Sequence, residues 1–427
     1  MEVLVLLGHI PAFLSIFLTV QTWYFIYVNF LPFVGQLPYL KRVNPYKACL
    51  RIGYILLPWC EFLDVKIRVP ESAEDEDIDL GDNEESQKSS SFDKAKDNLI
   101  DSDFDYAEEQ FTAYRNFFVN LYRIVPFRSL SRLWGQVNSV EVPLFLRAPM
   151  YGLYARLFNC NLGEALVEDF KQYKNLQEFF MRELKPDVRP VDAHHTLVSP
   201  CDGRVLHFGK VEKSKLEQVK GVTYSLKEFL GPRSTIPADA VDGKYEVSDE
   251  DYHSSLCQKE GTSLYHCVIY LAPGDYHRFH SPTNWTAHHR RHFPGELLSV
   301  NPGIARWVRG LFNYNERVCI TGEWQYGFFS LTAVGATNVG SIAFYCDQEL
   351  CTNLTGKYKP GIYFDKSLKS CHKESIDHDG VVMTKGTGIG TFNLGSTIVL
   401  VFEAPKDFEF VFNSGDKIRL GERLGSL

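Results

Sequence analysis

The sequence predicts an α+β protein, in which an N-terminal membrane anchor and amphipathic helices precede a mainly antiparallel β domain with a barrel-sandwich-like core. Three observations support this prediction. The first 40 residues are almost free of charge, residues 114–137 show helical periodicity, and the chain beyond residue 190 consists of short β-rich runs separated by glycine and proline. A chain of 427 residues has room for one large or two ordinary domains with appendages.

The N-terminal segment predicts a membrane anchor with interfacial segments within residues 1–70. No charged residue occurs in residues 3–40, and this apolar stretch is long enough to span a bilayer. A cleaved signal peptide is the alternative, but Glu2 stands where such peptides carry basic residues, and no arginine-rich amphipathic presequence is visible. A second apolar stretch, residues 52–63, is short for a span and fits an interfacial segment. Two candidate segments leave the orientation open.

An acidic segment follows the predicted anchor. Residues 71–110 carry 16 acidic and three basic residues, a local charge of −13, so the rest of the chain is at +5 against a total of −8. Such a serine-rich, like-charged segment predicts a disordered linker. The positive remainder suits an anionic membrane surface, whereas the absence of a dense Lys/Arg stripe argues against nucleic acid. Ten cysteines without a CxxC motif indicate neither a zinc site nor a redox pair.

Residues 111–190 predict an amphipathic helical region that faces the membrane. Apolar and aromatic residues recur at helical spacing, with four arginines among them. This pattern fits the core face of a helix and equally a helix lying on a membrane interface. A second helix is predicted over residues 162–186, where Pro186 ends it. The periodic residues are Tyr114, Phe117, Phe118, Leu121, Tyr122, Val125, Leu130, Leu133, Trp134 and Val137.

Residues 191–427 predict the β-rich domain. The final turn, with Gly415-Asp416-Lys417 and Gly421-Glu422, resembles the half-barrel repeat of biotinyl and lipoyl carriers and suggests a sandwich-like barrel. Within this domain Gly395-Ser396 stands between two strand-like runs. Because glycine and serine are ordinary turn residues, the local prediction there is a hairpin turn.

Three short stretches carry residues that could perform chemistry. "VSPCDGRV" holds Asp202, "YLAPGDYHRFHSP" holds His277 and His280, and "NLGST" holds Ser396. A carboxylate, an imidazole and a hydroxyl from separate loops are the parts of a relay that activates a serine. Each residue alone also has an ordinary interpretation, as a turn aspartate or as a satisfied core or surface histidine. The "HHRRH" run at residues 288–292 has metal-like spacing, but a solvated cationic loop is the preferred interpretation and a headgroup contact the next.

Four motifs together resemble those of the pyruvoyl-dependent phosphatidylserine decarboxylases. They are "SPCDG", "DYHRFHSP", "HFPGELLSVNPG" and "KGTGIGTFNLGST", and they occur in the order of that family. The resemblance runs from about residue 122 to the C-terminus. Two departures, Cys201 and Thr387, touch no reacting group.

The resemblance implies that the chain is a proenzyme that cleaves itself between Gly395 and Ser396. Asp202 would orient His280, whose imidazole would activate the Ser396 hydroxyl to attack the Gly395 carbonyl carbon. The resulting ester would eliminate and hydrolyse to leave a pyruvoyl group at position 396. The products would be a β chain of residues 1–395 and an α chain of residues 396–427. Glycine at 395 allows close approach and strained dihedral angles, and Thr397 would help to orient the intermediate.

The resemblance also implies a second stage, in which this covalently bound pyruvate is the cofactor. It would form a Schiff base with the amine of phosphatidylserine and withdraw electrons as CO₂ leaves. His277 would donate a proton to the carbanion, a task that suits a near-neutral imidazole. The product would be phosphatidylethanolamine.

The same resemblance places the enzyme in the mitochondrial inner membrane, where its partner is phosphatidylserine in the bilayer. An endomembrane or a lipid droplet is the alternative compartment. The oligomeric state stays open, with a homodimer as one option.

Two other functions compete with a decarboxylase. A membrane-anchored serine hydrolase would also use Ser396, but the GxSxG elbow is absent. A non-enzymatic lipoyl-like domain would present a lysine at the hairpin tip, where this chain has Gly-Ser.

Overall fold

The computed structural model of the chain describes residues 119–120, 122–219, 221–233, 248–337, 341–356, 358–369, 380–393 and 396–426. These belong to one compact unit, residues 83–427. The predicted anchor, the acidic linker and Gly395 lie outside the described residues. Within the described ranges, no helix is long and apolar enough to cross a membrane.

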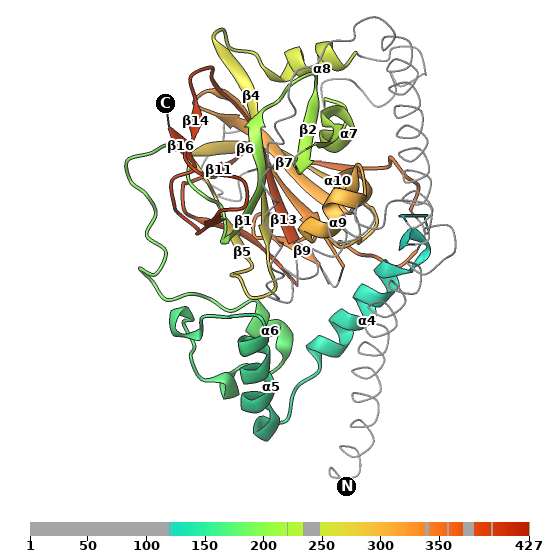
Figure 1. Ribbon diagram of the computed structural model, residues 1–427, viewed down its shortest axis with the longest axis vertical. Coiled ribbons are helices and arrows are strands. Elements are labelled where there is room, and N and C mark those ends of the chain that lie inside the picture. Colours follow the sequence, from blue (N-terminus) through green and yellow to red (C-terminus); the bar gives the residue numbers. More distant parts are fainter. Residues whose placement is uncertain are drawn as a thin grey trace, which may run out of the picture. The chain divides into compact units, whose positions relative to one another are not determined.

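The main sheet of the described chain has nine strands, and every pairing in it is antiparallel (Figure 1). A short strand, β11 (Val381–Met383), pairs with β6 beside the main path. Along the path the strands run β10 (Phe364–Ser367), β6 (Trp285–Phe293), β7 (Arg317–Trp324), β8 (Gly327–Gly335), β13 (Ser396–Pro405), β4 (Thr262–Leu271), β1 (Gly203–Lys210) and β15 (Lys417–Ile418).

Three smaller sheets complete the β structure of the described residues. They are β5 (Arg278–His280) with β12 (Gly388–Phe392) and β9 (Ile342–Phe344), then β2 (Lys215–Val219) with β3 (Val222–Ser225), and β14 (Glu409–Phe410) with β16 (Gly425–Ser426).

The antiparallel β domain is confirmed, but its predicted barrel is not. The described strands form no closed barrel, because β10 and β15 are the two ends of the main path and do not pair with each other. The hairpin predicted at Gly395-Ser396 is also wrong. β12 and β13 belong to different sheets, so the chain around the predicted cleavage site passes from one sheet to another instead of turning back on itself.

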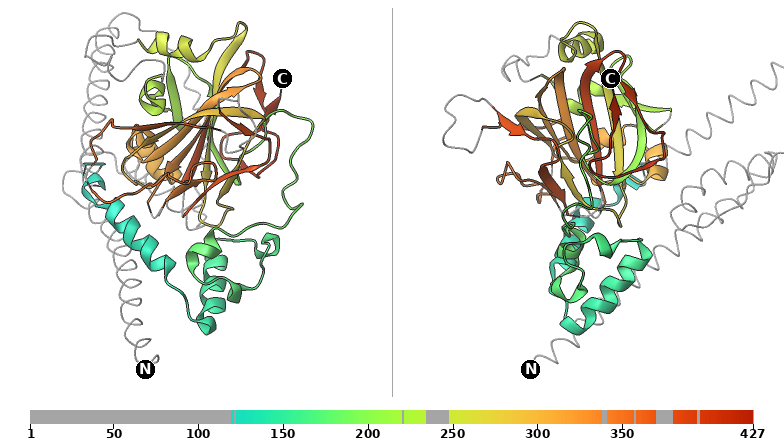
Figure 2. Two further views of the ribbon diagram at one scale, coloured as in Figure 1. Left: turned by 180° about the vertical axis from the view of Figure 1, so that it is seen from behind. Right: turned by 90° about the vertical axis from the view of Figure 1, so that its left-hand side faces the viewer.

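Short helices pack beside the main sheet. α7 (Leu226–Leu230), α9 (Pro302–Trp307) and α10 (Leu311–Tyr314) lie together, and α8 (Asp249–Leu256) lies near the end of β2 (Figures 1 and 2). The buried Gln218 on β2 joins them, since its amide donates to the Val308 carbonyl at 2.9 Å and accepts from the Leu311 backbone at 3.0 Å. A buried amide with these partners is satisfied and fixes the position of the helices.

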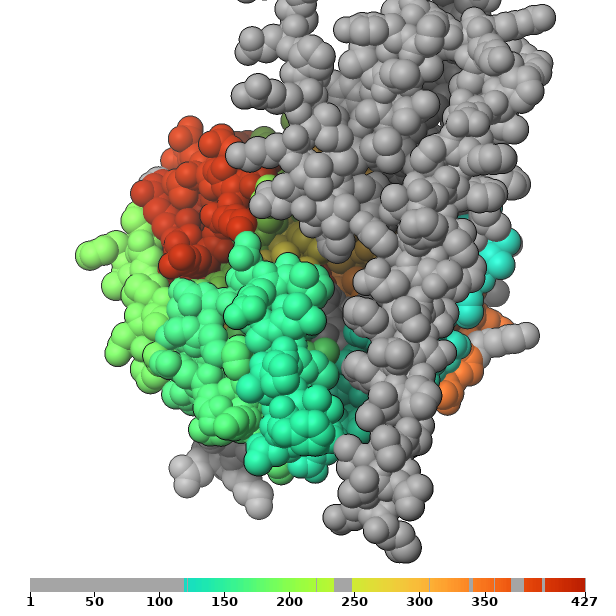
Figure 3. All heavy atoms as spheres, turned by 60° about the horizontal axis from the view of Figure 1, so that its bottom comes forward, coloured from blue at the N-terminus to red at the C-terminus, as the bar shows by residue number. Residues whose placement is uncertain are grey.

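The helical region comes before β1 and lies at one end of the strands (Figures 2 and 3). It contains α4 (Phe127–Ser139) and α5 (Leu144–Leu157), then the 3₁₀ turns η2 (Leu162–Glu164) and η3 (Phe170–Gln172), and α6 (Leu176–Phe180). The periodicity of residues 130–137 is confirmed as α4. α5 was not predicted, because its apolar residues surround the helix instead of forming a stripe.

The predicted helix over residues 162–186 is wrong, because three polar side chains divide the segment. Asn161 accepts from the Gly163 amide, Asp169 from the Lys171 amide and Asn175 from the Glu178 amide. Each of these bonds caps the start of a new short turn. The segment therefore folds as η2, η3 and α6.

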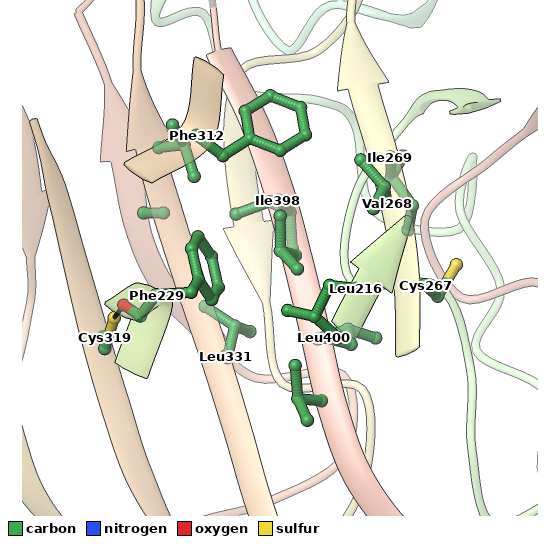
Figure 4. Close-up of a cluster of buried hydrophobic side chains, with 14 of the residues drawn as sticks. Leu216, Phe229, Cys267, Val268, Ile269, Phe312, Cys319, Leu331, Ile398 and Leu400 are labelled. Atoms are coloured by element: carbon green, nitrogen blue, oxygen red, sulfur yellow. Dashed lines mark hydrogen bonds between the residues drawn. The ribbon is translucent and has the colours of Figure 1, made fainter. Parts of the chain in front are cut away.

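β13 runs through the centre of the main sheet and supplies much of the core. It pairs with β4 along its whole length and with β8 over its first seven residues, and its residues are buried from Ser396 to Ala404. Figure 4 shows Ile398 and Leu400 of β13 among side chains from β2, β4, β8 and α7. An apolar strand flanked on both sides is strongly specified in register, because a one-residue slip would reverse every side chain.

The predicted cationic loop at residues 288–292 is part of β6, and this corrects the preferred interpretation. Arg290 pairs with Asp347 at 2.9 Å, Arg291 with Asp365 at 2.7 Å, and His292 with Glu316 at 2.8 Å. The arginines and His292 are buried. Their carboxylate partners come from distant segments, which is why the run looked unpaired in the sequence.

Candidate active site

Ser396 is the first residue of β13 and is completely buried. It lies in register with Leu271 at the end of β4 and with Gly335 at the end of β8. Neither its hydroxyl nor that of the neighbouring Thr397 has a hydrogen-bond partner within the described residues. Buried hydroxyls are normally paired, so this pair of unsatisfied groups marks a site where another group can be accommodated.

His277 lies in the connection from β4 to β5, and its side chain is fully buried. Its Nδ1 lies 2.9 Å from the Asp275 carbonyl oxygen, which can only accept, so Nδ1 carries the hydrogen and Nε2 bears a lone pair. Nε2 has no partner in the described part of the chain. The Phe180 ring packs against the imidazole with centroids 4.0 Å apart. Burial lowers the pKa of His277 to about 3, so the ring is neutral at pH 7.

His280 ends β5, and both of its ring nitrogens have partners. Nδ1 donates to the Gly386 carbonyl at 2.9 Å, and Nε2 therefore accepts from the Tyr276 hydroxyl at 3.1 Å. Burial lowers the pKa of His280, although the Gly386 carbonyl and the charge of Asp202 act in the opposite direction. The carbonyl of Gly386 thus fixes the tautomer that the relay requires.

Asp202 lies at the start of β1, close to His280 in the backbone but paired elsewhere. The His280 amide donates to the Pro200 carbonyl at 2.7 Å, which brings the two segments together. The carboxylate itself accepts from Arg189 Nη2 at 2.6 Å and Nε at 2.9 Å, and from the Leu420 amide at 2.8 Å. None of these hydrogen bonds joins the Asp202 carboxylate to the His280 ring, so the predicted contact between the two side chains is absent from them.

Arg189 is a site residue that the sequence motifs did not reveal. It is nearly buried, and beyond Asp202 it also donates to Glu164 at 2.7 Å. The hydrogen bond to Asp202, with that to Glu164, raises the pKa of Arg189, and the same guanidinium lowers the pKa of Glu164. No local pattern around "DVRPV" signals this role. The pairing depends on how η2 and β1 pack.

Asp275 is a half-buried carboxyl in the β4–β5 connection. Burial raises its pKa, while the Ala272 amide, which donates to it at 2.8 Å, acts against that shift. The connection between β4 and β5 therefore holds Asp275 and His277, and His280 follows at the end of β5. The connection begins at Leu271, the register partner of Ser396.

The structure thus gathers the predicted residues around one turn, without joining them as a finished relay. Ser396 begins β13 beside the end of β4, and the two histidines follow β4 in the chain. Within the described residues no hydrogen bond joins Ser396 to His280. Gly395, the other half of the predicted cleavage site, lies outside the described residues.

The candidate serine is thus a buried residue within a sheet, not an exposed nucleophile on an elbow. The phosphatidylserine decarboxylase family model matches residues 176–426. A relative named phosphatidylserine decarboxylase proenzyme, mitochondrial, from Pongo abelii is 57% identical over 309 residues, covering 72% of this chain and 74% of the relative.

Fungal relatives give the same result. Phosphatidylserine decarboxylase proenzyme 1, mitochondrial, of Schizosaccharomyces pombe is 43% identical over 353 residues, covering 70% of this chain and 80% of the relative. The protein of that name from Saccharomyces cerevisiae is 38% identical over 372 residues, covering 71% and 73%. The chain belongs to the phosphatidylserine decarboxylase family, and the resemblance carried by the four motifs is confirmed.

Replacing Arg189 tests whether the guanidinium positions Asp202. Arg189→Gln leaves the Asp202 carboxylate buried with fewer donors, and we expect self-cleavage to slow by about 10-fold or more. Arg189→Lys, which keeps one charged donor, should retain an intermediate rate. Glu164→Gln is the control, because it leaves the Arg189–Asp202 pair intact. The fraction cleaved over time is measured by gel and intact mass. A wild-type rate in Arg189→Gln would remove Arg189 from the site.

Acid stability tests the environment of His277. Its pKa is about 3 in the folded chain against an ordinary 6.5, so between these values the unfolded chain binds the proton and the folded chain does not. The free energy of unfolding should fall as the pH falls from 6.5 towards 3, by about 1.4 kcal/mol per pH unit from this group. Urea unfolding of Ser396→Ala is compared with Ser396→Ala/His277→Asn, whose slope should be shallower by that amount.

A matched control for this measurement is His194→Asn in the Ser396→Ala background. His194 is exposed, so its replacement should leave the pH dependence unchanged. Equal slopes with and without His277 would contradict the buried, neutral imidazole.

Proposed function

We propose that the chain is a proenzyme that cleaves itself between Gly395 and Ser396 and then decarboxylates phosphatidylserine to phosphatidylethanolamine and CO₂. The observation that carries this proposal is the buried, unpartnered hydroxyl of Ser396 at the start of the central strand. In the uncleaved chain Ser396 is enclosed, which suits a serine that reacts first with its own backbone. Substrate needs access to position 396 only after cleavage.

In the first stage His280 is the base for Ser396. Its Nδ1 hydrogen is held by the Gly386 carbonyl, so Nε2 is the nitrogen that can take the hydroxyl proton. The Tyr276 hydroxyl, now bonded to Nε2, must give up that bond or pass the proton along it. Ser396 Oγ then bonds to the Gly395 carbonyl carbon, the peptide bond to the Ser396 nitrogen breaks, and His280 returns the proton to that nitrogen.

The two product chains would stay together without a covalent link. β13 belongs to the α chain, residues 396–427, and its neighbours β4 and β8 belong to the β chain, residues 1–395. The Leu420 amide of the α chain also donates to Asp202 of the β chain. The main sheet is therefore shared between both products.

The proposed cofactor is pyruvate, as a pyruvoyl group formed from Ser396. The site fits such a group, because among the described residues neither the Ser396 hydroxyl nor that of the neighbouring Thr397 has a hydrogen-bond partner. When present, a ketone at this position supplies the electron sink for loss of CO₂. The buried surroundings exclude water from the developing charge.

His277 is proposed to move a proton in the second stage. Because burial lowers its pKa to about 3, the free site holds a neutral imidazole at pH 7, which cannot donate from Nε2. Nε2 must therefore take up a proton once the anionic lipid is bound, because the negative charge of the substrate favours the imidazolium. The imidazolium then gives that proton to the carbon from which CO₂ departs. His277, the predicted proton donor, thus becomes protonated only when the substrate is bound.

The helical region is proposed to lie on the membrane, because α4 buries some of its polar residues and exposes two of its leucines. Ser131 and Asn138 are buried, whereas Leu130 and Leu133 are exposed. Arg128 turns towards the β domain, where it donates to the Gly295 carbonyl at 2.5 Å. A helix in water normally has the opposite arrangement.

Further exposed apolar residues lie on α5 and its flanks, within the helical region that Figure 3 shows from outside. An apolar patch of this extent marks an interaction surface. A lipid bilayer is the occupant that we propose, because the substrate of the proposed reaction resides in one. The exposed residues are Ile124, Val140, Leu144, Phe145, Leu153, Leu157 and Leu166. The relatives are named as mitochondrial proteins, and we place this chain at the mitochondrial inner membrane.

Four substitutions test the two stages. Ser396→Ala, His280→Ala and Asp202→Ala should remain one uncleaved, inactive chain. His277→Ala should cleave yet lose about 100-fold or more in decarboxylation, the ordinary contribution of a proton-transfer group. Intact mass reports cleavage, and release of labelled CO₂ from phosphatidylserine vesicles reports turnover. A wild-type protein without the fragment that starts at position 396 would overturn the proposed function.

Charge placed on the outward face tests the membrane surface. Leu133→Glu with Leu144→Glu should weaken binding to phosphatidylserine vesicles about 10-fold or more, because two exposed apolar contacts are replaced by charges. Turnover of soluble dihexanoyl phosphatidylserine should stay within about twofold of wild type. Gln136→Glu adds a charge at an exposed polar position of α4 and is the control. Unchanged vesicle binding in the double variant would reject this surface.

A further inference from the structure

Arg182, which follows α6, is a buried arginine with two side-chain nitrogens that make no hydrogen bond within the described residues. Its side chain is 4% exposed, and its Nη2 donates to the Gly274 carbonyl at 2.9 Å. Nε and Nη1 have no hydrogen-bond partner within the described residues, and no carboxylate there lies within 4.0 Å of the guanidinium. The remaining contact is the Phe179 ring, whose centroid lies 5.6 Å from the guanidinium carbon.

Other buried arginines among the described residues have their donors bonded. Arg290 and Arg291 each pair with an aspartate, whereas Arg317, which has no carboxylate partner, donates from Nε, Nη1 and Nη2 to backbone carbonyls. A buried guanidinium with two unbonded nitrogens is costly to keep. Arg182 therefore indicates a place where an anion is expected to bind.

The position of Arg182 ties it to the reacting residues. Gly274, which accepts its hydrogen bond, lies in the β4–β5 connection between Leu271 and His277. Leu271 is the register partner of Ser396, and His277 packs against Phe180, two residues before Arg182. One end of the guanidinium is thus fixed to the turn that carries the proposed proton-transfer group.

Arg182 also lines a cavity of about 340 Å³ formed largely by the helical region. This volume is at the small end for ligand cavities, so it suits a headgroup, with acyl chains left outside. Leu166, which also lines it, is half exposed and belongs to the proposed membrane surface. The second arginine of the cavity, Arg278, is already bound to Glu183 at 2.8 Å and to the Met181 carbonyl at 3.1 Å.

We propose that Arg182 binds the phosphodiester of the phospholipid headgroup and positions the serine portion at residue 396. This inference rests on the proposed function. A phosphodiester keeps its charge throughout the reaction, whereas the carboxylate leaves as CO₂. An arginine on the carboxylate would stabilise the starting state and oppose its loss, so the phosphate is the better partner. The acids of the cavity wall, Glu178 and Glu183, accept from the Lys174 amide and from Arg278, and leave Arg182 to the ligand.

The test compares Arg182→Gln, Arg182→Lys and Arg306→Gln, all as self-cleaved enzymes. For Arg182→Gln we expect the KM for dihexanoyl phosphatidylserine to rise about 10- to 100-fold, with kcat within about threefold. Arg182→Lys should lie between it and wild type. Arg306 is exposed on α9, and its replacement should change neither constant.

Binding of the reaction product shows whether Arg182 recognises the phosphate or the carboxylate. Phosphatidylethanolamine keeps the phosphate and lacks the carboxylate, so its inhibition constant and its calorimetric Kd, measured with the dihexanoyl lipid, should rise by the same factor as KM. A rise in KM alone would assign Arg182 to the carboxylate and overturn the proposal. Unchanged KM and Kd, or failure of both Arg182 variants to self-cleave, would also overturn it. A wild-type enzyme inactive on phosphatidylserine would instead refute the proposed function.

Discussion

The antiparallel pairing of β13 with β4 on one side and β8 on the other determines where every candidate group lies. Its register places Ser396 opposite Leu271, and the chain that leaves Leu271 leads to both histidines. β12, on the other side of the predicted cleavage site, pairs with β5, so His280 is held in a strand. β12 and β13 therefore belong to two different sheets.

This arrangement buries the His277 side chain, and burial sets the protonation state of its imidazole. An imidazole enclosed among Phe180 and backbone carbonyls loses its proton, as the lowered pKa of His277 shows. A neutral ring whose Nδ1 hydrogen is bound presents only an acceptor at Nε2. The ring must then take up a proton when the anionic substrate binds, because the negative charge of the substrate favours the imidazolium. The burial of His277 thus sets its protonation state.

The motifs predicted the antiparallel β domain, and the candidate residues they named lie in segments that the fold brings together, because both are expressed in short stretches of sequence. Their partners could not be predicted in this way. Leu420 reaches Asp202 across 218 positions of the chain, and Arg189 has no surrounding pattern that distinguishes it from a surface arginine. The helix predicted over residues 162–186 failed because three side-chain caps outweighed helical propensity. The barrel and the hairpin failed because strand pairing is decided by the whole sheet.

The polar contacts of α4 with the β domain link these features to the lipid. Arg128 and Arg132 hold the helix through the Gly295 carbonyl and the Asn353 side chain, so the helix does not depend on its leucines to dock. Those leucines are left free for another apolar phase. The cavity at Arg182 opens in the same helical region, beside the exposed Leu166. A headgroup could therefore reach the site while its acyl chains remain in the bilayer, which avoids exposing two hydrocarbon chains to water.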